Sequence, residues 1–141
     1  MNPIYDVAIL GCGEAGIFAA YELAHHRPGL KVLARDQGRD IYHRSCPIVA
    51  GKVRECIHCS VCDTMCGFGG AGAFSDGKFN FTTQFGGWLT DFMEPRQVME
   101  LIDYVDSINV AHGATQEVFS TESAEAKALA GAGLAELGYQ R

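Results

Sequence analysis

The stretch IYDVAILGCGEAG, residues 4–16, decides the fold that we expect for this chain. Residues 4–10 are rich in Val and Ile and alternate little, which is typical of a strand buried on both faces. The glycine pattern G-x-G-x-x-G follows at once, at Gly11, Gly13 and Gly16. The sequence therefore predicts a strand that ends in a tight glycine turn and leads directly into a helix.

The three glycines would have separate roles in this turn. The first allows the tight bend, the second lets a pyrophosphate approach the backbone, and the third lets the helix pack closely on the strand. The N–H groups at the start of the helix, around Glu14 and Ala15, would hold the phosphates with the positive end of the helix dipole. Alternatively, the glycines serve only the turn and its packing. Cys12, inside the turn, is interpreted as a packing residue.

A second strand and an acidic residue complete the pattern. The helix should stop at Pro28 and Gly29, and residues 30–34 are predicted to form the second strand. Asp36 follows, about 20 residues after the last glycine of the turn, where a carboxylate can accept hydrogen bonds from both ribose hydroxyls of an adenosine. We therefore expect an α/β fold with a Rossmann-like βαβ unit over residues 4–36 that binds FAD or NAD(P).

Five of the six cysteines lie within residues 46–66. Cys56, Cys59, Cys62 and Cys66 follow C-x2-C-x2-C-x3-C, the spacing of ferredoxin-type iron–sulfur sites. The fourth ligand of a [4Fe–4S] cluster would be Cys66 or the more distant Cys46. Zinc could bind the same thiolates, the thiols could have a redox role, and they could also simply pack. All four interpretations stay open.

Residues 40–92 are predicted to form a long loop rich in Cys and Gly, and loops of this length usually have a function. The run GGAG at residues 69–72 allows close backbone approach to a ligand. Beyond the loop, a helix is predicted over residues 95–112, because Val98, Leu101, Ile102, Val105 and Ile108 form one apolar face. A second helix is predicted over residues 121–137.

Length and composition exclude several classes of protein. The chain has 141 residues, of which 48% are hydrophobic, and this length suits one domain. The net charge of −6 and the scattered Lys and Arg residues argue against nucleic-acid binding. No apolar run is long enough for a signal peptide or a membrane span, so we expect a cytoplasmic protein without a membrane partner. In a reducing compartment, clustered thiols favour metal or redox use.

Three segments together resemble a known family: the glycine pattern of residues 11–16, RSCP at 44–47 with the cysteine spacing after it, and GFGGAGAFSDGK at 67–78. They are similar to the bacterial and archaeal FAD-dependent dehydrogenases, which belong to the flavoproteins with two dinucleotide-binding domains. The similarity extends to ELIDYVD at 100–106. Two departures are small: Glu14 stands where the family usually has proline, and Asp36 stands where it usually has glutamate.

The resemblance implies an FAD-dependent oxidoreductase that acts on a small-molecule substrate. It implies that the turn and Asp36 contact the pyrophosphate and ribose of FAD. It also implies a loop near the flavin that includes Gly69, Gly70, Ala71, Gly72, Ser75 and Lys78. Family members are several times longer, so we expect residues 1–141 to be the N-terminal part of one FAD-binding domain, with the remainder as a possible separate partner chain. The alternative is a small module that binds iron–sulfur or zinc through thiolates and has no catalytic activity.

Overall fold

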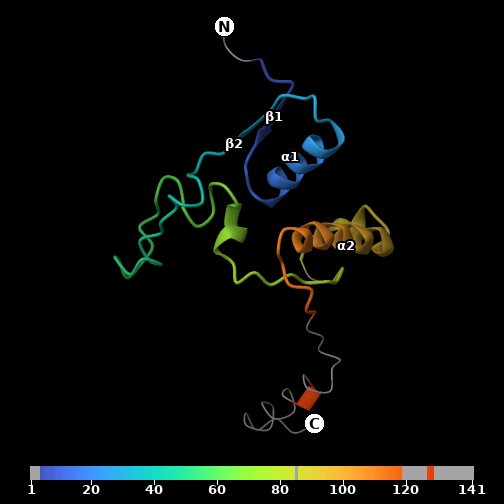
Figure 1. The fold of residues 1–141 in the computed structure, drawn as a ribbon. Coiled ribbons are helices and arrows are strands. Elements are labelled where there is room, and N and C mark those ends of the chain that lie inside the picture. Colours follow the sequence, from blue (N-terminus) through green and yellow to red (C-terminus); the bar gives the residue numbers. More distant parts are fainter. Residues whose placement is uncertain (1–3, 85, 119–126, 129–141) are drawn as a thin grey trace. The chain divides into compact units, whose positions relative to one another are not determined.

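The computed structural model describes residues 4–84, 86–118 and 127–128 and has an α/β fold (Figure 1). Its elements, in chain order, are β1 (Val7–Leu10), α1 (Glu14–His26), β2 (Val32–Arg35), the short 3-10 helices η1 (Gly70–Phe74) and η2 (Leu89–Asp91), and α2 (Pro95–Ala111). The chain divides into two compact units, Met1–Phe79 and Asn80–Arg141. Each unit is described by itself below.

Strands β1 and β2 form a two-stranded parallel sheet, in which Val7 lies opposite Val32 and Leu10 lies opposite Arg35. Helix α1 connects the two strands and contacts both of them. The predicted order of strand, turn, helix and strand is therefore confirmed. Both strands begin later than predicted, at Val7 and Val32. Just before them, the Lys31 amide donates to the Asp6 carboxylate at 2.8 Å, and the Lys31 carbonyl accepts from the Asp6 amide at 2.9 Å.

The predicted helix over residues 95–112 is confirmed as α2. Pro95 is its first residue, and the Gln97 side chain accepts a hydrogen bond from the Glu94 amide at 3.1 Å, which stabilises the first turn. On the predicted apolar face, Val98 and Ile108 are buried, whereas Leu101 is 45% exposed. Apart from residues 127 and 128, the second predicted helix, over 121–137, lies outside the described residues.

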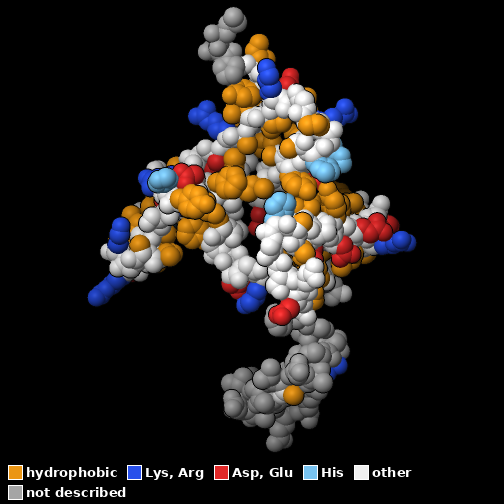
Figure 2. Space-filling model, in the orientation of Figure 1, with side chains coloured by type: hydrophobic (Ala, Val, Ile, Leu, Met, Phe, Trp, Pro, Cys, Tyr) orange, Lys and Arg blue, Asp and Glu red, His pale blue; other side chains and the backbone are white. Residues whose placement is uncertain are grey.

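The hydrophobic core of the described residues is small. Its buried apolar members are Cys12 in the first unit and Val98 and Ile108 in the second. Large apolar side chains such as Leu10 and Trp88 are 86% and 79% exposed, and apolar side chains cover much of the surface visible in Figure 2. A sheet of two strands offers little surface on which to bury side chains. The positions of functional groups therefore depend on turns and hydrogen bonds more than on a core.

The predicted long loop, residues 40–92, has no β-strand and no α-helix among its described residues, and it contains the two short 3-10 helices η1 and η2. The division between the two units falls inside this loop, after Phe79. None of the helices that the structure describes combines the length and the apolar character needed to cross a membrane.

Candidate functional site

The three glycines of the turn differ in how strongly the chain itself requires them. Gly11 has a φ angle of +103°, which residues other than glycine rarely adopt. A Cβ atom on Gly16 would overlap the carbonyl oxygen of Gly11. Gly13 has an ordinary φ of −72°, and a Cβ atom there would lie 3.8 Å from the Gly70 Cα, a normal contact. The fold requires glycine at positions 11 and 16, but not at 13.

Asp36 holds the turn together with two other segments. Its Oδ2 atom accepts a hydrogen bond from the Cys12 amide at 2.8 Å. Its Oδ1 atom accepts from the Gly38 amide at 2.8 Å and from the Gly67 amide at 2.7 Å. A carboxylate has about four acceptor positions, so about one remains, on Oδ2. Asp36 therefore has a structural role that the sequence did not reveal, and it keeps room for one further donor.

The electrostatics of Asp36 and Cys12 follow from this arrangement. The hydrogen bonds from the Cys12 and Gly38 amides, with a smaller effect from the Gly67 amide and the Arg44 charge, lower the pKa of Asp36 although burial opposes them. Burial, and then the negative charge of Asp36, raise the pKa of the Cys12 thiol. Cys12 is thus buried and less acidic than an ordinary thiol, in agreement with a packing role.

The glycine run that was predicted to lie near a flavin packs against the turn. The Gly69 amide donates to the Cys12 carbonyl at 2.8 Å. A Cβ atom on Gly70 would come within 2.9 Å of the Gly13 Cα, and one on Gly72 would overlap the Glu14 carboxylate. Only residues without side chains can approach the start of α1 this closely. The structure thus brings together two glycine segments that lie more than 50 residues apart in the sequence.

An open cavity of about 480 Å³ lies at the carboxyl ends of the two strands. Leu10, Gly11, Arg35, Asp36 and Gln37 line it. In open parallel sheets, ligands bind outside the carboxyl ends of the strands. The cavity contains the first glycine of the turn and the carboxylate that the sequence predicted to bind ribose.

Ser75 and Lys78 have local contacts. The Ser75 hydroxyl accepts a hydrogen bond from the Gly77 amide at 3.1 Å. The Lys78 ammonium forms an ion pair with Asp76 at 2.8 Å, and its side chain is 82% exposed. The hydrogen bond to Asp76 and the charge of this carboxylate raise the pKa of Lys78. In this structure the two side chains stabilise their own turn, and their predicted role near a flavin stays a prediction.

The cysteine segment, residues 46–66, contains a second cavity, of about 220 Å³, which we call the thiol cavity. Four of its lining residues are Cys46, Cys56, Cys59 and Cys62. Cys66 is not among the described residues that line it, and the Cys66 Sγ instead accepts a hydrogen bond from the Gln37 side chain at 3.1 Å. None of the six cysteines forms a disulfide. Among the described residues, no three Cys, His, Asp or Glu side chains are placed to hold a metal ion, so the metal site also stays a prediction.

Arg44 is a site residue whose role the sequence did not indicate. Its side chain is 7% exposed. The guanidinium donates to the carbonyls of Asp63 at 2.7 Å, Thr64 at 2.9 Å and Phe68 at 2.8 Å, and it lies 4.8 Å from the centre of the Phe74 ring. No local pattern distinguishes an arginine that binds carbonyls about 20 residues away. Arg44 joins the start of the cysteine segment to its end.

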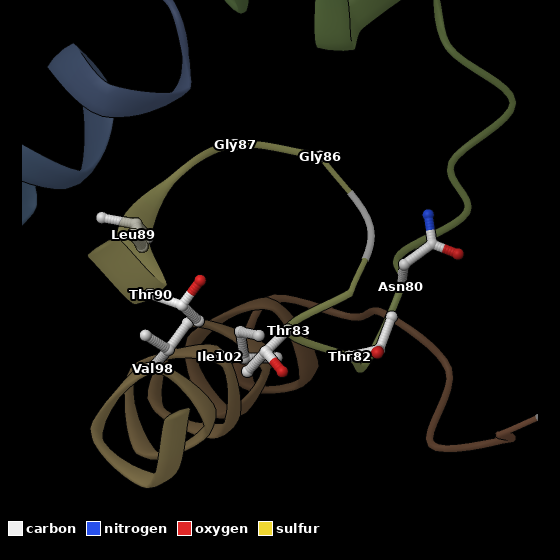
Figure 3. A pocket seen from close by; sticks show the side chains of 9 residues that line it. All are labelled: Asn80, Thr82, Thr83, Gly86, Gly87, Leu89, Thr90, Val98 and Ile102. Carbon is white, nitrogen blue, oxygen red and sulfur yellow. The ribbon is translucent and has the colours of Figure 1, made fainter. Parts of the chain in front are cut away.

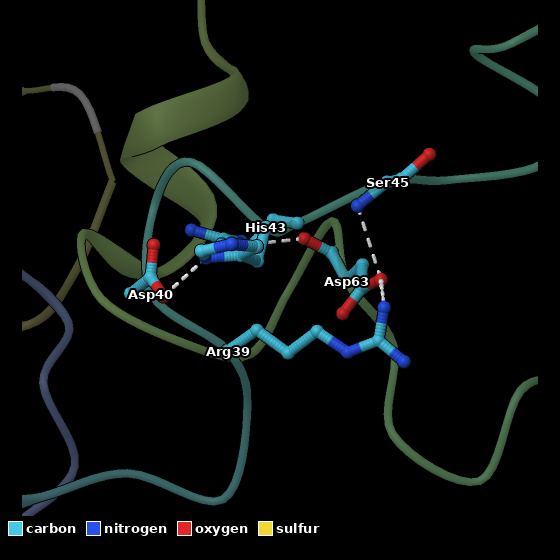
Figure 4. A network of polar contacts seen from close by, with 6 residues as sticks. Arg39, Asp40, His43, Ser45 and Asp63 are labelled. Carbon is cyan, nitrogen blue, oxygen red and sulfur yellow. Dashed lines mark hydrogen bonds and ion pairs between the residues drawn. The ribbon is translucent and has the colours of Figure 1, made fainter.

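A polar network around Asp63 strengthens this connection (Figure 4). The Asp63 carboxylate accepts a hydrogen bond from the Ser45 amide at 3.0 Å and lies 3.7 Å from the Arg39 guanidinium. Beside it, the Asp40 carboxylate lies 2.6 Å from Nδ1 of His43, and this hydrogen bond lowers the pKa of Asp40. The network holds the backbone just before Cys46 against the residue that follows Cys62.

The Cys46 thiol differs from its neighbours in its surroundings. Hydrogen bonds from the Val49 backbone, the Thr64 side chain and the Ile48 backbone lower the pKa of Cys46, while burial and the Asp63 charge oppose them. The segment after Cys46 folds back on itself, because the Ala50 amide donates to the Cys46 carbonyl at 2.8 Å. Cys46 therefore occupies a defined turn at the edge of the thiol cavity.

The second unit has a cavity of its own, of about 250 Å³ (Figure 3). Thr82, Thr83 and Thr90 contribute hydroxyls, and Val98 and Ile102 of α2 contribute apolar side chains. None of the described residues that line it has a titratable side chain. Sequence reasoning did not find this cavity, because its threonines follow no helix or strand period. It offers hydrogen bonds but no acid or base.

Comparison with protein families, curated proteins and solved structures found no match to this chain. Its function is therefore inferred from its own residues. Two sets of residues in the first unit have the chemistry to bind a ligand. One is the glycine turn with Asp36 and the open cavity, and the other is the cysteine segment with the thiol cavity.

Proposed function

We propose that residues 4–36 form a Rossmann-like unit that binds FAD by its ADP moiety, and that this chain is part of an FAD-dependent oxidoreductase. The observation that supports this most is the glycine at position 13. A side chain there would fit the chain without overlap, since its Cβ would lie 3.8 Å from the nearest atom, the Gly70 Cα. A pyrophosphate that approaches the backbone is a reason for glycine at this position of the turn.

The start of α1 would bind the pyrophosphate. Gly13 is the N-cap of the helix, and no side chain caps the first turn. The amides of Glu14 and Ala15 point along the helix axis with the positive end of its dipole, so they favour an anionic ligand. The Glu14 carboxylate has the opposite effect, because it adds a negative charge to the first turn. Binding of the pyrophosphate at the start of α1 would therefore depend on backbone groups.

The ribose of the adenosine would bind at Asp36. The acceptor position that remains on Oδ2 can take one ribose hydroxyl, and the open cavity beside it, of about 480 Å³, gives the adenine space. Because hydrogen bonds from three backbone amides keep the pKa of Asp36 low, the carboxylate is ionised near neutral pH and acts as an acceptor.

When bound, FAD would supply hydride or electron transfer through its isoalloxazine ring. The residues of this chain would bind and orient the cofactor. Gly70 and Gly72, which pack against the start of α1, would bring backbone close to the pyrophosphate side of the cofactor. Ser75 and Lys78 follow this run in the sequence, and we propose them as residues near the flavin.

A second candidate is a small thiolate metal-binding module without catalytic activity. The observation that favours it is the thiol cavity, where four cysteines share one space. The absorption spectrum of anaerobically purified protein separates the two candidates. Flavin bands support the oxidoreductase, whereas a colourless protein that contains only zinc contradicts it.

The decisive experiment measures FAD binding to the full chain by quenching of flavin fluorescence, with competition by ADP. Gly13→Ala should weaken binding about tenfold or more, because its methyl group occupies the path of the pyrophosphate. It should lower the free energy of unfolding by only about 0.5–1 kcal/mol, the cost of a poorer N-cap. The matched control is Gly29→Ala, whose Cβ would meet nothing within 4 Å.

The control should bind FAD as the wild type does, and ADP should displace FAD from both. If Gly13→Ala and wild type bind FAD equally, or if the wild-type chain binds neither FAD nor ADP, the proposal is wrong for this chain.

A further inference from the structure

We infer that Cys46, Cys56, Cys59 and Cys62 ligate an iron–sulfur cluster in the thiol cavity, and that Cys66 lies outside the ligand set. The spacing of the cysteines alone left Cys46 and Cys66 as equal candidates for the fourth ligand. The cavity separates them, because Cys46 lines it and Cys66 is not among its described lining residues. This inference does not rest on FAD binding, since it concerns a different cavity.

The position of Cys46 is set by contacts that do not involve any thiol. Arg44 donates to the carbonyls of Asp63 and Thr64 at 2.7 and 2.9 Å, and the Ser45 amide donates to the Asp63 carboxylate at 3.0 Å. These bonds hold the residue before Cys46 beside the residue after Cys62. Two of the four ligands are thus brought to the same cavity by the buried arginine, before any metal binds.

Cys66 has a different environment. The Cys66 amide donates to the Cys62 carbonyl at 2.8 Å, which closes a helical turn between the two cysteines. The Cys66 Sγ accepts a hydrogen bond from the Gln37 side chain at 3.1 Å, close to the end of β2. The thiol therefore has a partner on the side of the strands and not in the thiol cavity.

The chemistry of the spacing agrees with this choice. In bacterial ferredoxins with two clusters, which have the spacing C-x2-C-x2-C-x3-C-P, the fourth cysteine ligates the other cluster. A cysteine from elsewhere in the chain then completes the site. Here Cys46 is such a distant cysteine, and Pro47 follows it directly. Gly67, and not proline, follows Cys66, so the spacing by itself permits a distant fourth ligand without excluding Cys66, and it is the cavity that favours Cys46.

A cluster needs more space between its thiolates than a single ion does. Zinc–sulfur bonds of about 2.3 Å would draw four sulfurs to within about 4 Å of one another. A cluster places a cube of iron and sulfide between its thiolates, so they stand farther apart around a space such as this one, of about 220 Å³. Pro47, Ile48 and Val53 also line the space and add apolar surface to it.

The test reconstitutes the full chain anaerobically with ferrous iron and sulfide. Iron and sulfide per chain and the electron paramagnetic resonance spectrum after reduction are then measured. Cys46→Ser should lose most of the bound iron, whereas Cys66→Ser, the matched control, should keep the wild-type content. Circular dichroism of the metal-free variants establishes that both are folded as the wild type is.

A second measurement uses the wild-type chain and needs no variant. Iodoacetamide labelling followed by mass spectrometry compares the loaded and metal-free protein. Cys46, Cys56, Cys59 and Cys62 should become protected on loading, and Cys66 should be labelled equally in both. Protection of Cys66 in place of Cys46, retention of iron by Cys46→Ser, or binding of zinc but no iron would each overturn the inference.

Discussion

The glycine turn (residues 11–16) and the central part of the cysteine segment (residues 53–61) differ in what holds their backbones. In the turn, the Gly11 amide bonds to β2, the Cys12 amide bonds to Asp36, and the Cys12 carbonyl accepts from Gly69. Among the described hydrogen bonds, none involves the backbone of residues 53–61. Cys56 and Cys59 in that part are exposed.

The two segments therefore differ in how far the chain's own hydrogen bonds fix their geometry. The turn has its geometry in the free chain, because glycine conformations and the Asp36 carboxylate specify it. The thiols of the central cysteine segment share a cavity, but only Cys46 and Cys62 lie next to residues anchored by Arg44 and Asp63. A bound cluster would supply the order that hydrogen bonds do not supply there.

The largest effect is expected from Gly16→Ala. Its methyl group would overlap the Gly11 carbonyl oxygen, which is backbone and cannot move without opening the turn. We expect the free energy of unfolding of the first unit to fall by about 3 kcal/mol or more. Amide hydrogen exchange in α1 measures this locally. Protection equal to that of Gly29→Ala would show that the turn is not as tightly packed as described.

A smaller but clear effect is expected from Asp36→Asn. The amide side chain cannot accept from all three of the Cys12, Gly38 and Gly67 amides, and it has no charge. We expect a loss of about 2–3 kcal/mol, since hydrogen bonds to charged groups contribute about 1.5–3 kcal/mol each. Urea unfolding measures it, and Asp40→Asn, at an exposed carboxylate, is the control.

The same variant gives a prediction for pH. The folded state lowers the pKa of Asp36 below its unfolded value of about 3.9, so its stabilisation is complete above that pH and is lost as the pH falls through the folded pKa. Wild type should therefore lose stability below about pH 4 more steeply than Asp36→Asn. Asp40 and Asp76, whose pKa values are also lowered, are unchanged in this variant. Equal slopes would contradict a structural role for the Asp36 charge.

The smallest effect is expected from Cys56→Ser in the metal-free chain. The thiol is exposed, and the backbone around it makes no described hydrogen bond, so the free energy of unfolding should change by less than about 0.5 kcal/mol. Loading with iron and sulfide should then stabilise the wild type and not the variant. A large loss of stability without metal would mean that the central cysteine segment is formed on its own.

Much of the first unit could be predicted because its signals are local. Apolar residues of β1 and the glycines of the turn depend on near neighbours in the chain, and they correctly predicted a strand, a helix and a parallel partner strand. The start of each strand was predicted too early, and at the observed start the Lys31 amide donates to the Asp6 side chain. The pattern of apolar residues does not indicate where a side chain will accept a hydrogen bond from a backbone amide.

By itself, the sequence determined the βαβ order, the start of α2 at Pro95, and the set of glycines and cysteines from which any site must be built. Only the tertiary structure decided that Gly70 packs on Gly13, that Asp36 binds three amides, and that Arg44 brings Cys46 beside Cys62. The physical reason is distance along the chain. Propensity and periodicity act over a few residues, whereas all of these contacts except the hydrogen bond from the Gly38 amide to Asp36 join segments about 20 to 60 residues apart, and they exist only after the loop has folded back.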